Sequence, residues 1–125
     1  MIWFRKKHPF LCEEEKLQIG CVRWFERTYP GLVPLLHHSP NEGERTWFER
    51  VKLRQMGMRK GFPDLVLMIP CQGYSALCIE LKTASGRLSE AQRKEINYLK
   101  MSGKCKVSVV RSENDFRNLI NDYLK

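Results

Sequence analysis

The 125-residue sequence contains no apolar run approaching the roughly 20 residues that a membrane-spanning helix needs. Internal repeats, low-complexity segments and long linkers are also missing, so we expect one compact domain. The opening segment MIWFRKKHPF places its charges after its apolar residues, the reverse of a secretory signal. These absences predict a protein without a membrane segment and a cytoplasmic location.

Paired cysteines are missing as well. The five cysteines are an odd number, widely scattered, with no C-x-x-C pair and no histidine at zinc-ligand spacing. Cys21, Cys78 and Cys105 fall on apolar-facing or strand positions. We therefore interpret them as buried thiols of a reducing compartment, and not as a disulfide framework or a zinc site.

Acidic residues are scarce relative to basic ones. The chain has 22 Lys and Arg against 14 Asp and Glu, a formal charge of +8, while 42% hydrophobic residues suffice for a core. This balance favours a polyanionic partner, with nucleic acid as the first candidate. The positive charge concentrates in residues 44–60, where six basic residues face only Glu44 and Glu49. That segment is either a solvated face or a DNA contact, and the overall charge favours DNA.

Apolar periodicity and turn residues predict eight elements in the order α, β, α, β, β, α, β, α. The predicted helices span residues 13–28, 44–58, 89–101 and 113–123, and the predicted strands span 32–37, 64–69, 75–82 and 105–110. Four aromatic residues at helical spacings are expected in the core or a dimer interface and not as base-stacking platforms: Trp24, Trp47, Phe48 and Tyr98.

The segment FPDLVLMIPCQGYSALCIELK reads as two strands joined by a turn at CQG or CQGY. Centring the turn on Gln72 pairs residues whose numbers sum to about 144, which puts the leucines and isoleucines of both strands on one face. The same register places Asp64 directly opposite Glu80, with Lys82 on the face of Glu80.

Directly opposed carboxylates lie about 4.5 to 5.5 Å apart at Cβ and repel each other. A proton or the amine of Lys82 could relieve this repulsion, which would be a structural role. A divalent cation between Asp64 and Glu80 is the alternative, since Mg²⁺ binds one or two carboxylates together with substrate phosphates. The cation also gives Lys82 a function, because its amine would reach an attacking water or a developing negative charge.

The predicted first helix offers a further carboxylate. At about 100° per residue, Glu14 lies within roughly 40° of the apolar face formed by Leu17, Cys21, Trp24 and Phe25. An inward acid needs a partner such as a metal cluster or Lys82. The alternative is that Glu14 only complements the helix dipole from the first turn.

The segments PDLVLMIP, LCIELK and SGRLSEAQ together resemble the catalytic signature of the VRR-NUC nucleases, a branch of the PD-(D/E)XK superfamily. EEKLQIGCVRWFERTYP is similar to the opening helix of that family, HHSPNEGER to its loop, and GMRKGFPD to its approach to the aspartate. The similarity runs from about residue 13 to residue 123. E-x-K alone occurs by chance, but the ordered set with its spacing is specific.

The resemblance implies an α/β fold with a restriction-endonuclease-like core, a mixed sheet of about four strands flanked by helices, and the basic helix inserted after the first strand. Residues 13–125 would form a single VRR-NUC domain preceded by a basic arm, residues 1–12. The implied metal ligands are Asp64, Glu80 and the carbonyl of Leu81, and the implied catalytic residues also include Glu14, Lys82 and Gln92.

Some of these residues have structural alternatives. Asp64 can be only a turn residue, and Glu80 with Lys82 only a solvated strand edge, although the joint pattern opposes that interpretation. Ser89 and Gln92 fit a capping box, which would satisfy Gln92 without catalysis. His37 and His38 lack ligand spacing, and we expect His38 in a loop or cleft. The residues expected to contact DNA are Asn41, Arg45, Arg59, Lys60 and Arg87.

The resulting hypothesis is a Mg²⁺-dependent DNA endonuclease, with Mn²⁺ as a substitute, that leaves 5′-phosphate and 3′-hydroxyl ends. By resemblance its substrate would be branched DNA such as Holliday (four-way) junctions, which a two-fold homodimer suits. A DNA-repair role and a bacterial or phage source are expected with it. A sequence- or mismatch-directed nuclease and a non-catalytic DNA-binding module remain as alternatives.

Overall fold

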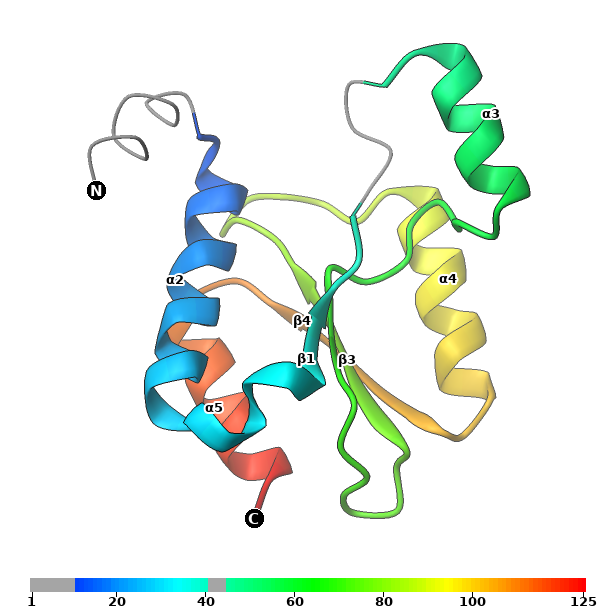
Figure 1. Ribbon diagram of the computed structural model, residues 1–125. Coiled ribbons are helices and arrows are strands. Elements are labelled where there is room, and N and C mark those ends of the chain that lie inside the picture. Colours follow the sequence, from blue (N-terminus) through cyan, green and yellow to red (C-terminus); the bar gives the residue numbers. More distant parts are fainter. Residues whose placement is uncertain (1–10, 41–44) are drawn as a thin grey trace.

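The protein is described here by a computed structural model covering residues 11–40 and 45–125. A four-stranded mixed sheet forms its centre, in the order β1-β2-β3-β4 (Figure 1). The pairs β1/β2 and β2/β3 are antiparallel, and β3/β4 is parallel. The expected α/β class and order of elements are confirmed. Most of the expected N-terminal arm, and Asn41, lie outside the described residues.

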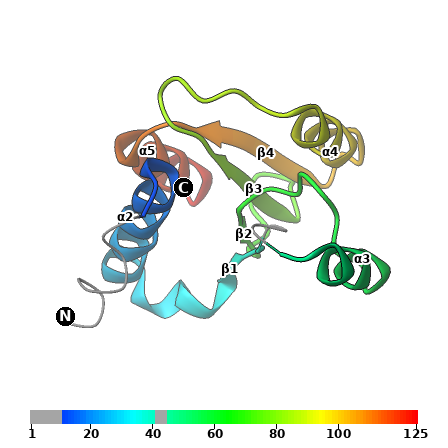
Figure 2. The same cartoon turned by 90° about the horizontal axis from the view of Figure 1, so that it is seen from above.

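The elements follow one another as α2 (Glu13–Thr28), η1 (Pro30–Leu35), β1 (Leu36–His38), α3 (Trp47–Gln55), β2 (Leu65–Leu67), β3 (Ala76–Leu81), α4 (Glu90–Met101), β4 (Cys105–Val110) and α5 (Glu113–Tyr123). Helices α2 and α5 cover one face of the sheet and α4 covers the other (Figure 2). The parallel pair β3/β4 requires a crossover, which α4 provides. Among the helices that the structure describes, none is long and apolar enough to cross a membrane.

The predicted hairpin register is confirmed. Leu65 pairs with Ile79 and Leu67 with Leu77, so the paired numbers sum to 144. The turn at Gln72 and Gly73 has φ values of 54° and 86°, which two-residue hairpin turns of the I′ type require at both central positions. The two strands of the hairpin are each one to two residues shorter at their ends than expected. Asp64 therefore lies immediately before β2.

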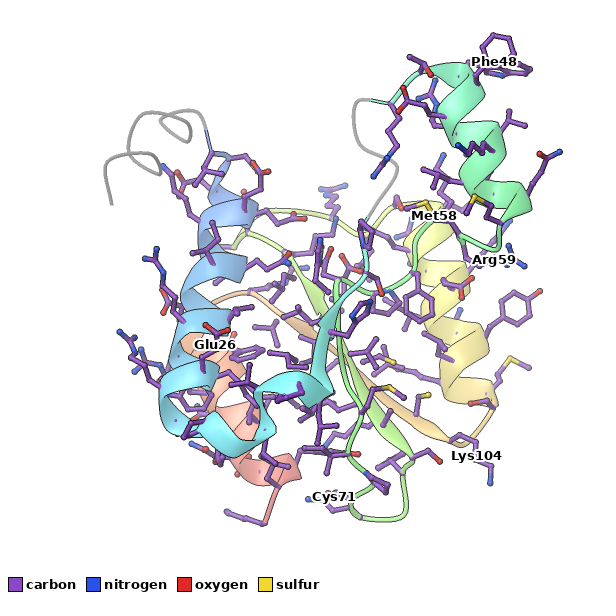
Figure 3. All side chains as sticks on the ribbon, viewed as in Figure 1. Glu26, Phe48, Met58, Arg59, Cys71 and Lys104 are labelled. Atoms are coloured by element: carbon purple, nitrogen blue, oxygen red, sulfur yellow. The ribbon has the colours of Figure 1, made fainter. Side chains whose placement is uncertain are left out.

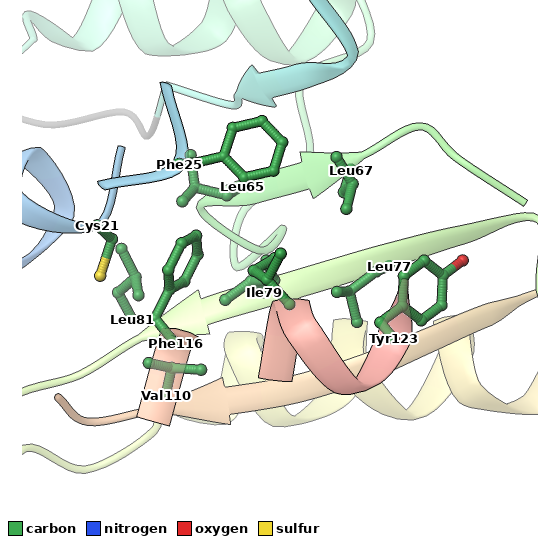
Figure 4. Close-up of a cluster of buried hydrophobic side chains, with 11 residues drawn as sticks. Cys21, Phe25, Leu65, Leu67, Leu77, Ile79, Leu81, Val110, Phe116 and Tyr123 are labelled. Carbon is green, nitrogen blue, oxygen red and sulfur yellow. The ribbon is translucent and has the colours of Figure 1, made fainter. Parts of the chain in front are cut away.

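The two faces of the sheet bury separate apolar clusters. The leucines and isoleucines of the hairpin pack against Cys21 and Phe25 of α2 and the apolar side of α5 (Figure 4). On the opposite face, Val66 and Cys78 pack against Ile96 of α4. The predicted division of the hairpin between two faces is therefore confirmed. All five cysteines are free thiols, as expected from their scatter; Cys21 and Cys78 are buried as predicted, whereas Cys105 is only half-buried.

The strand predicted over residues 32–37 is wrong for most of its length. A 3₁₀ helix, η1, occupies Pro30–Leu35, and only the next three residues pair with β2. Pro30 opens η1 and Pro34 lies within it; the proline ring fixes φ near −65°, which suits a short helical turn. The apolar residues of this segment therefore pack from a helical turn.

The helix predicted over residues 44–58 is shorter, since α3 covers Trp47–Gln55. Thr46 caps its N-terminus by accepting a hydrogen bond from the Glu49 amide, and Gly57 follows its end at a φ of 109°. The prediction that the four aromatic residues at helical spacings lie in the core is wrong for three of them. Trp47, Phe48 and Tyr98 are 65%, 79% and 70% exposed, whereas Trp24 packs against the core.

Candidate active site

Three carboxylates from distant parts of the chain meet at one end of the sheet. Glu14 lies in the first turn of α2, Asp64 directly before β2, and Glu80 within β3. Each offers an oxygen, and these oxygens all lie within 4.8 Å of one another. The hairpin register brings Asp64 and Glu80 together, and the packing of α2 adds Glu14.

The backbone around Asp64 is held from two sides. Its Oδ2 accepts a hydrogen bond from the Leu81 amide at 2.8 Å, which ties the carboxylate to β3. Its carbonyl oxygen accepts from the Ser39 amide at 2.9 Å and lies 3.1 Å from His38 Nδ1. One oxygen of the Asp64 carboxylate is thus fixed by the sheet, and this orients the other oxygen.

Glu80 is the only charged side chain that the structure buries fully within the described residues, at 1% exposure. Its Oε2 accepts a hydrogen bond from Gln92 Nε2 at 3.2 Å. Its Oε1 is buried and has no hydrogen-bond partner among the described residues. A buried polar atom without a partner costs free energy, so this oxygen calls for a proton or a cation.

The electrostatics of Glu80 point the same way. The pKa of Glu80 is raised to about 9: burial contributes most, the neighbouring Asp64 carboxyl adds to the rise, and the Lys82 ammonium opposes it. The cluster without a cation therefore holds a proton at neutral pH. An added divalent cation would replace that proton, because two adjacent carboxylates can both ionise when a positive charge lies between them.

Glu14 reaches the same cluster from α2, which covers the face of the sheet opposite to α4. It is half-buried, and this burial is the main cause of its raised pKa. The Lys82 ammonium lowers the pKa of Glu14, and the Asp64 carboxylate raises it. The predicted inward orientation of Glu14 is therefore present in the structure. Because Glu14 also lies in the first turn of α2, complementing the helix dipole and joining the cluster are compatible.

Lys82 follows β3 and brings a positive charge to the three acids. Its side chain is half-buried, and its charge acts on both Glu14 and Glu80. Its amide donates a hydrogen bond to the Val110 carbonyl at 2.9 Å, which continues the ladder with β4. The paired strand thus fixes the backbone position from which the Lys82 side chain acts on these carboxylates.

These residues fit a hard divalent cation. Carboxylate and carbonyl oxygens are the ligands that Mg²⁺ and Mn²⁺ prefer. The Leu81 amide points to Asp64, and in a strand the carbonyl of a residue projects to the same side as its amide, so the Leu81 carbonyl also faces the cluster. Oε1 of Glu80, which has no hydrogen-bond partner among the described residues, is a further oxygen that can bind the cation.

Gln92 combines two contacts that the sequence left as alternatives. Its side-chain Oε1 accepts a hydrogen bond from the backbone amide of Ser89 at 2.8 Å, and Ser89 Oγ accepts one from the backbone amide of Gln92 at 3.1 Å. These two bonds form the capping box of α4. The same side chain uses Nε2 to hold Glu80. The helix cap therefore fixes the amide that orients a carboxylate of the cluster.

The other predicted DNA-contacting residues lie on segments before and after α3 and on the loop after β3, outside the carboxylate cluster. Arg59 and Lys60 follow α3, and both are exposed; Arg59 Nη1 donates to the Arg54 and Met58 carbonyls. Arg87 is exposed on the loop between β3 and α4. Arg45 is half-buried before α3. The structure thus leaves three of these cations accessible to a polyanion.

Two positioning residues are absent from the sequence-based prediction. Gly61 has a φ of 84°, and a Cβ there would lie 2.5 Å from the backbone of Ala91, so only glycine fits between the approach to Asp64 and the first turn of α4. His38 Nδ1 lies 2.9 Å from Gln18 Nε2 and 3.1 Å from the Asp64 carbonyl oxygen, so the imidazole sits between α2 and the Asp64 backbone and its tautomer decides which of the two contacts is a hydrogen bond. The G-F-P-D sequence signalled a turn at Gly61, but nothing in the sequence signalled the contact between Gln18 and His38.

Comparison with known proteins agrees with this architecture. The family model of the VRR-NUC domain matches residues 8–114, so the chain belongs to the VRR-NUC family. Its domain is a nuclease domain of the restriction-endonuclease-like fold. No match is found among curated proteins.

The similar solved structures include two whose names give the VRR-NUC domain. The first, named "VRR_NUC domain protein", is 28% identical with a TM-score of 0.77, covering 91% of this chain and 89% of the other. The second, named "VRR_NUC domain", is 22% identical with a TM-score of 0.58 over 90% of this chain and 99% of the other. The second likeness concerns the fold alone.

Proposed function

We propose that this protein is a metal-dependent DNA endonuclease that selects branched DNA. The observation that carries the proposal is the convergence of Glu14, Asp64 and Glu80 within 4.8 Å, next to the charge of Lys82 and with one buried carboxylate oxygen left unpartnered. A structural ion pair would have satisfied that oxygen. A cation site open to a phosphate leaves it available.

In the proposed reaction, Asp64, Glu80 and the Leu81 carbonyl would hold Mg²⁺, or Mn²⁺ in its place, and Glu14 would supply a third carboxylate. The bound cation supplies charge neutralisation at the scissile phosphate and a lowered pKa for a water. The Asp64 carboxylate is oriented by the Leu81 amide, and Glu80 by Gln92. The ligand set is therefore arranged before the substrate arrives.

Lys82 has the second task in this scheme. Its ammonium orients the attacking water or stabilises the negative charge that builds up on the phosphorus centre. The water gives up a proton to solvent as its oxygen bonds to phosphorus, and the bond from phosphorus to the 3′ oxygen breaks. The 3′ oxygen takes up a proton from solvent, which gives a 5′-phosphate and a 3′-hydroxyl end.

Substrate choice is the finer part of the proposal. The net charge of +8 supports binding to DNA, and the exposed Arg59, Lys60 and Arg87 offer phosphate contacts. A four-way junction has two-fold symmetry, and a homodimer carrying two of these sites would cut it symmetrically. We propose that arrangement together with a role in DNA repair.

A cleavage assay on three substrates tests this function. A mobile four-way junction, a flap and a linear duplex are each incubated with wild-type protein and Asp64→Asn, with and without Mg²⁺ or Mn²⁺. Wild type should cut the junction best and only with metal. Asp64→Asn should bind DNA with unchanged affinity but cut it at least 100-fold more slowly, because the basic surface is intact while a ligand is lost.

Each alternative gives a different result. Preferred cutting of a linear duplex of defined sequence would replace branch selection by sequence selection. A Lys82→Ala variant that cuts as fast as wild type would remove the proposed role of that lysine. DNA binding without cleavage under every metal condition would establish a non-catalytic binding module.

A further inference from the structure

Helix α3 exposes two large aromatic residues side by side. Trp47 and Phe48 are the first two residues of the helix, and their rings contact each other edge to face at 5.2 Å between centroids. Both side chains are largely exposed. Figure 3 shows Phe48 at the free end of α3, projecting away from the body of the protein. Large apolar rings held in water usually mark an interaction surface.

The helix has two distinct sides. Leu53 and Met56 line a hollow of about 440 Å³ together with His37 and Phe62, so this side of α3 faces the body of the protein. At 100° per residue, Trp47, Arg50, Val51 and Arg54 lie along the other side. The outward side of α3 thus joins an aromatic ring to two guanidinium groups.

The position of α3 relates this surface to the candidate active site. Figure 1 places α3 beyond the end of the sheet where β3 finishes, which is the end that carries the carboxylate cluster, and Figure 2 shows the helix on the side of β1 and β2. The helix rises beyond that end and has none of its side chains fully buried within the described part of the chain. A DNA duplex entering the site would pass beside it.

This surface could be covered by a second copy of the chain or by DNA, and its charge favours DNA. Residues Trp47–Gln55 contain Arg50, Lys52 and Arg54 against only Glu49. Two copies meeting through α3 about a two-fold axis would bring these like charges together. DNA offers phosphates to the arginines and base faces to the rings, and this combination of aromatic and cationic groups is the one that binds exposed bases.

We propose that Trp47 and Phe48 stack on base faces left exposed at a DNA branch point, with the arginines of α3 holding the adjoining phosphates. An intact duplex buries its base faces within the stack, so these rings gain a partner only where stacking is interrupted. Helix α3 would therefore be the element that distinguishes branched from linear DNA. This inference rests on the proposed endonuclease function.

The test uses the full-length chain with paired variants. The double variant Trp47→Ala/Phe48→Ala removes both rings, and Trp47→Leu/Phe48→Leu keeps apolar bulk without a stacking surface. Tyr98→Ala is the matched control, since Tyr98 is a similarly exposed aromatic residue on α4. The ratio of junction to linear-duplex cleavage rates should fall about tenfold or more in both double variants and stay within about twofold in the control.

A binding measurement makes the outcome independent of catalysis. A junction with 2-aminopurine at the branch point is titrated with Asp64→Asn protein, with and without the two ring substitutions. Stacking on Trp47 or Phe48 should quench the probe, and both double substitutions should abolish the quenching. Absence of any cleavage by the wild type, with quenching retained, would count against the endonuclease function alone.

Two results would overturn the inference. In the first, the double variants keep the wild-type substrate ratio and the wild-type quenching. In the second, sedimentation shows that the wild type is a dimer and that Trp47→Ala/Phe48→Ala is a monomer, while the leucine variant restores both the dimer and the substrate ratio. That pattern would assign the surface to a second copy of the chain.

Discussion

Gln92 and Glu80 are joined by a hydrogen bond of 3.2 Å from the amide nitrogen of the first to a carboxylate oxygen of the second. The side-chain oxygen of Gln92 accepts a hydrogen bond from the backbone amide of Ser89. This arrangement couples the start of α4 to a buried acid on β3. A helix cap and a metal-ligand orientation thus share one side chain.

Substitutions at Ser89 and Gln92 should separate the two roles. Gln92→Glu keeps an oxygen for the capping box but replaces the donor to Glu80 with an acceptor, so cleavage should fall about 10- to 100-fold with little loss of stability. Ser89→Ala should lose about 1 kcal/mol of unfolding free energy and retain most activity. Urea denaturation and single-turnover cleavage measure the two effects. Equal activity in Gln92→Glu and wild type would limit Gln92 to capping.

The raised pKa of Glu80 predicts a pH-dependent stability. The unfolded chain ionises this carboxyl near pH 4.5, whereas the folded protein without metal keeps its proton up to about pH 9. The stability that this proton contributes is fully present below pH 4.5 and is lost progressively as the pH rises to about 9. The free energy of unfolding should therefore fall across that window, by up to roughly 1.4 kcal/mol per pH unit.

Thermal unfolding in EDTA checks this dependence. Glu80→Gln should unfold at a higher temperature than wild type at pH 8 and show a flatter pH profile, because its neutral amide needs no proton. Glu26→Gln is the matched control, since Glu26 is an exposed carboxylate on α2 (Figure 3). A parallel pH profile for wild type and Glu80→Gln would contradict the predicted ionisation.

Metal addition should stabilise the wild type through the same carboxylates. A ligand at 100 times its dissociation constant adds about 2.7 kcal/mol, which raises the melting temperature by several degrees. The increase with Mg²⁺ or Mn²⁺ should grow from pH 6 to pH 8, because the cation must displace the proton of Glu80. Calorimetry of wild type, Asp64→Asn and Glu80→Gln measures it. A rise of equal size in all three proteins would place the cation elsewhere.

Gly61 provides a stability test of the contact between the Asp64 segment and α4. Gly61→Ala puts a Cβ 2.5 Å from the Ala91 backbone, so one of the two segments must move; we expect a loss of about 2 to 4 kcal/mol and weaker metal binding. Gly73→Ala is the matched control, because its φ of 86° is nearly the same but nothing lies within 4 Å. Similar losses in both variants would assign the effect to the backbone angle alone.

The sequence by itself determined the elements that local chemistry controls. The alternation of apolar residues set the hairpin register, and that register fixed Asp64 opposite Glu80. The serine and glutamine at the start of α4 predicted its capping box. Apolar spacing located α5 and β4 at their observed bounds. Each of these features depends on residues close in the chain or on one strand pairing, so a linear pattern suffices to predict it.

Packing between distant segments decided the rest. Proline geometry turned most of the expected first strand into η1, and the exposure of Trp47 and Phe48 followed from α3 projecting beyond the sheet. The meeting of Glu14 with the hairpin acids and the contact of Gly61 with α4 join residues 50 and 30 positions apart. Periodicity shows which side of an element is apolar. It does not show which other element that side meets, because the relative placement of elements is set by the shape of the whole core.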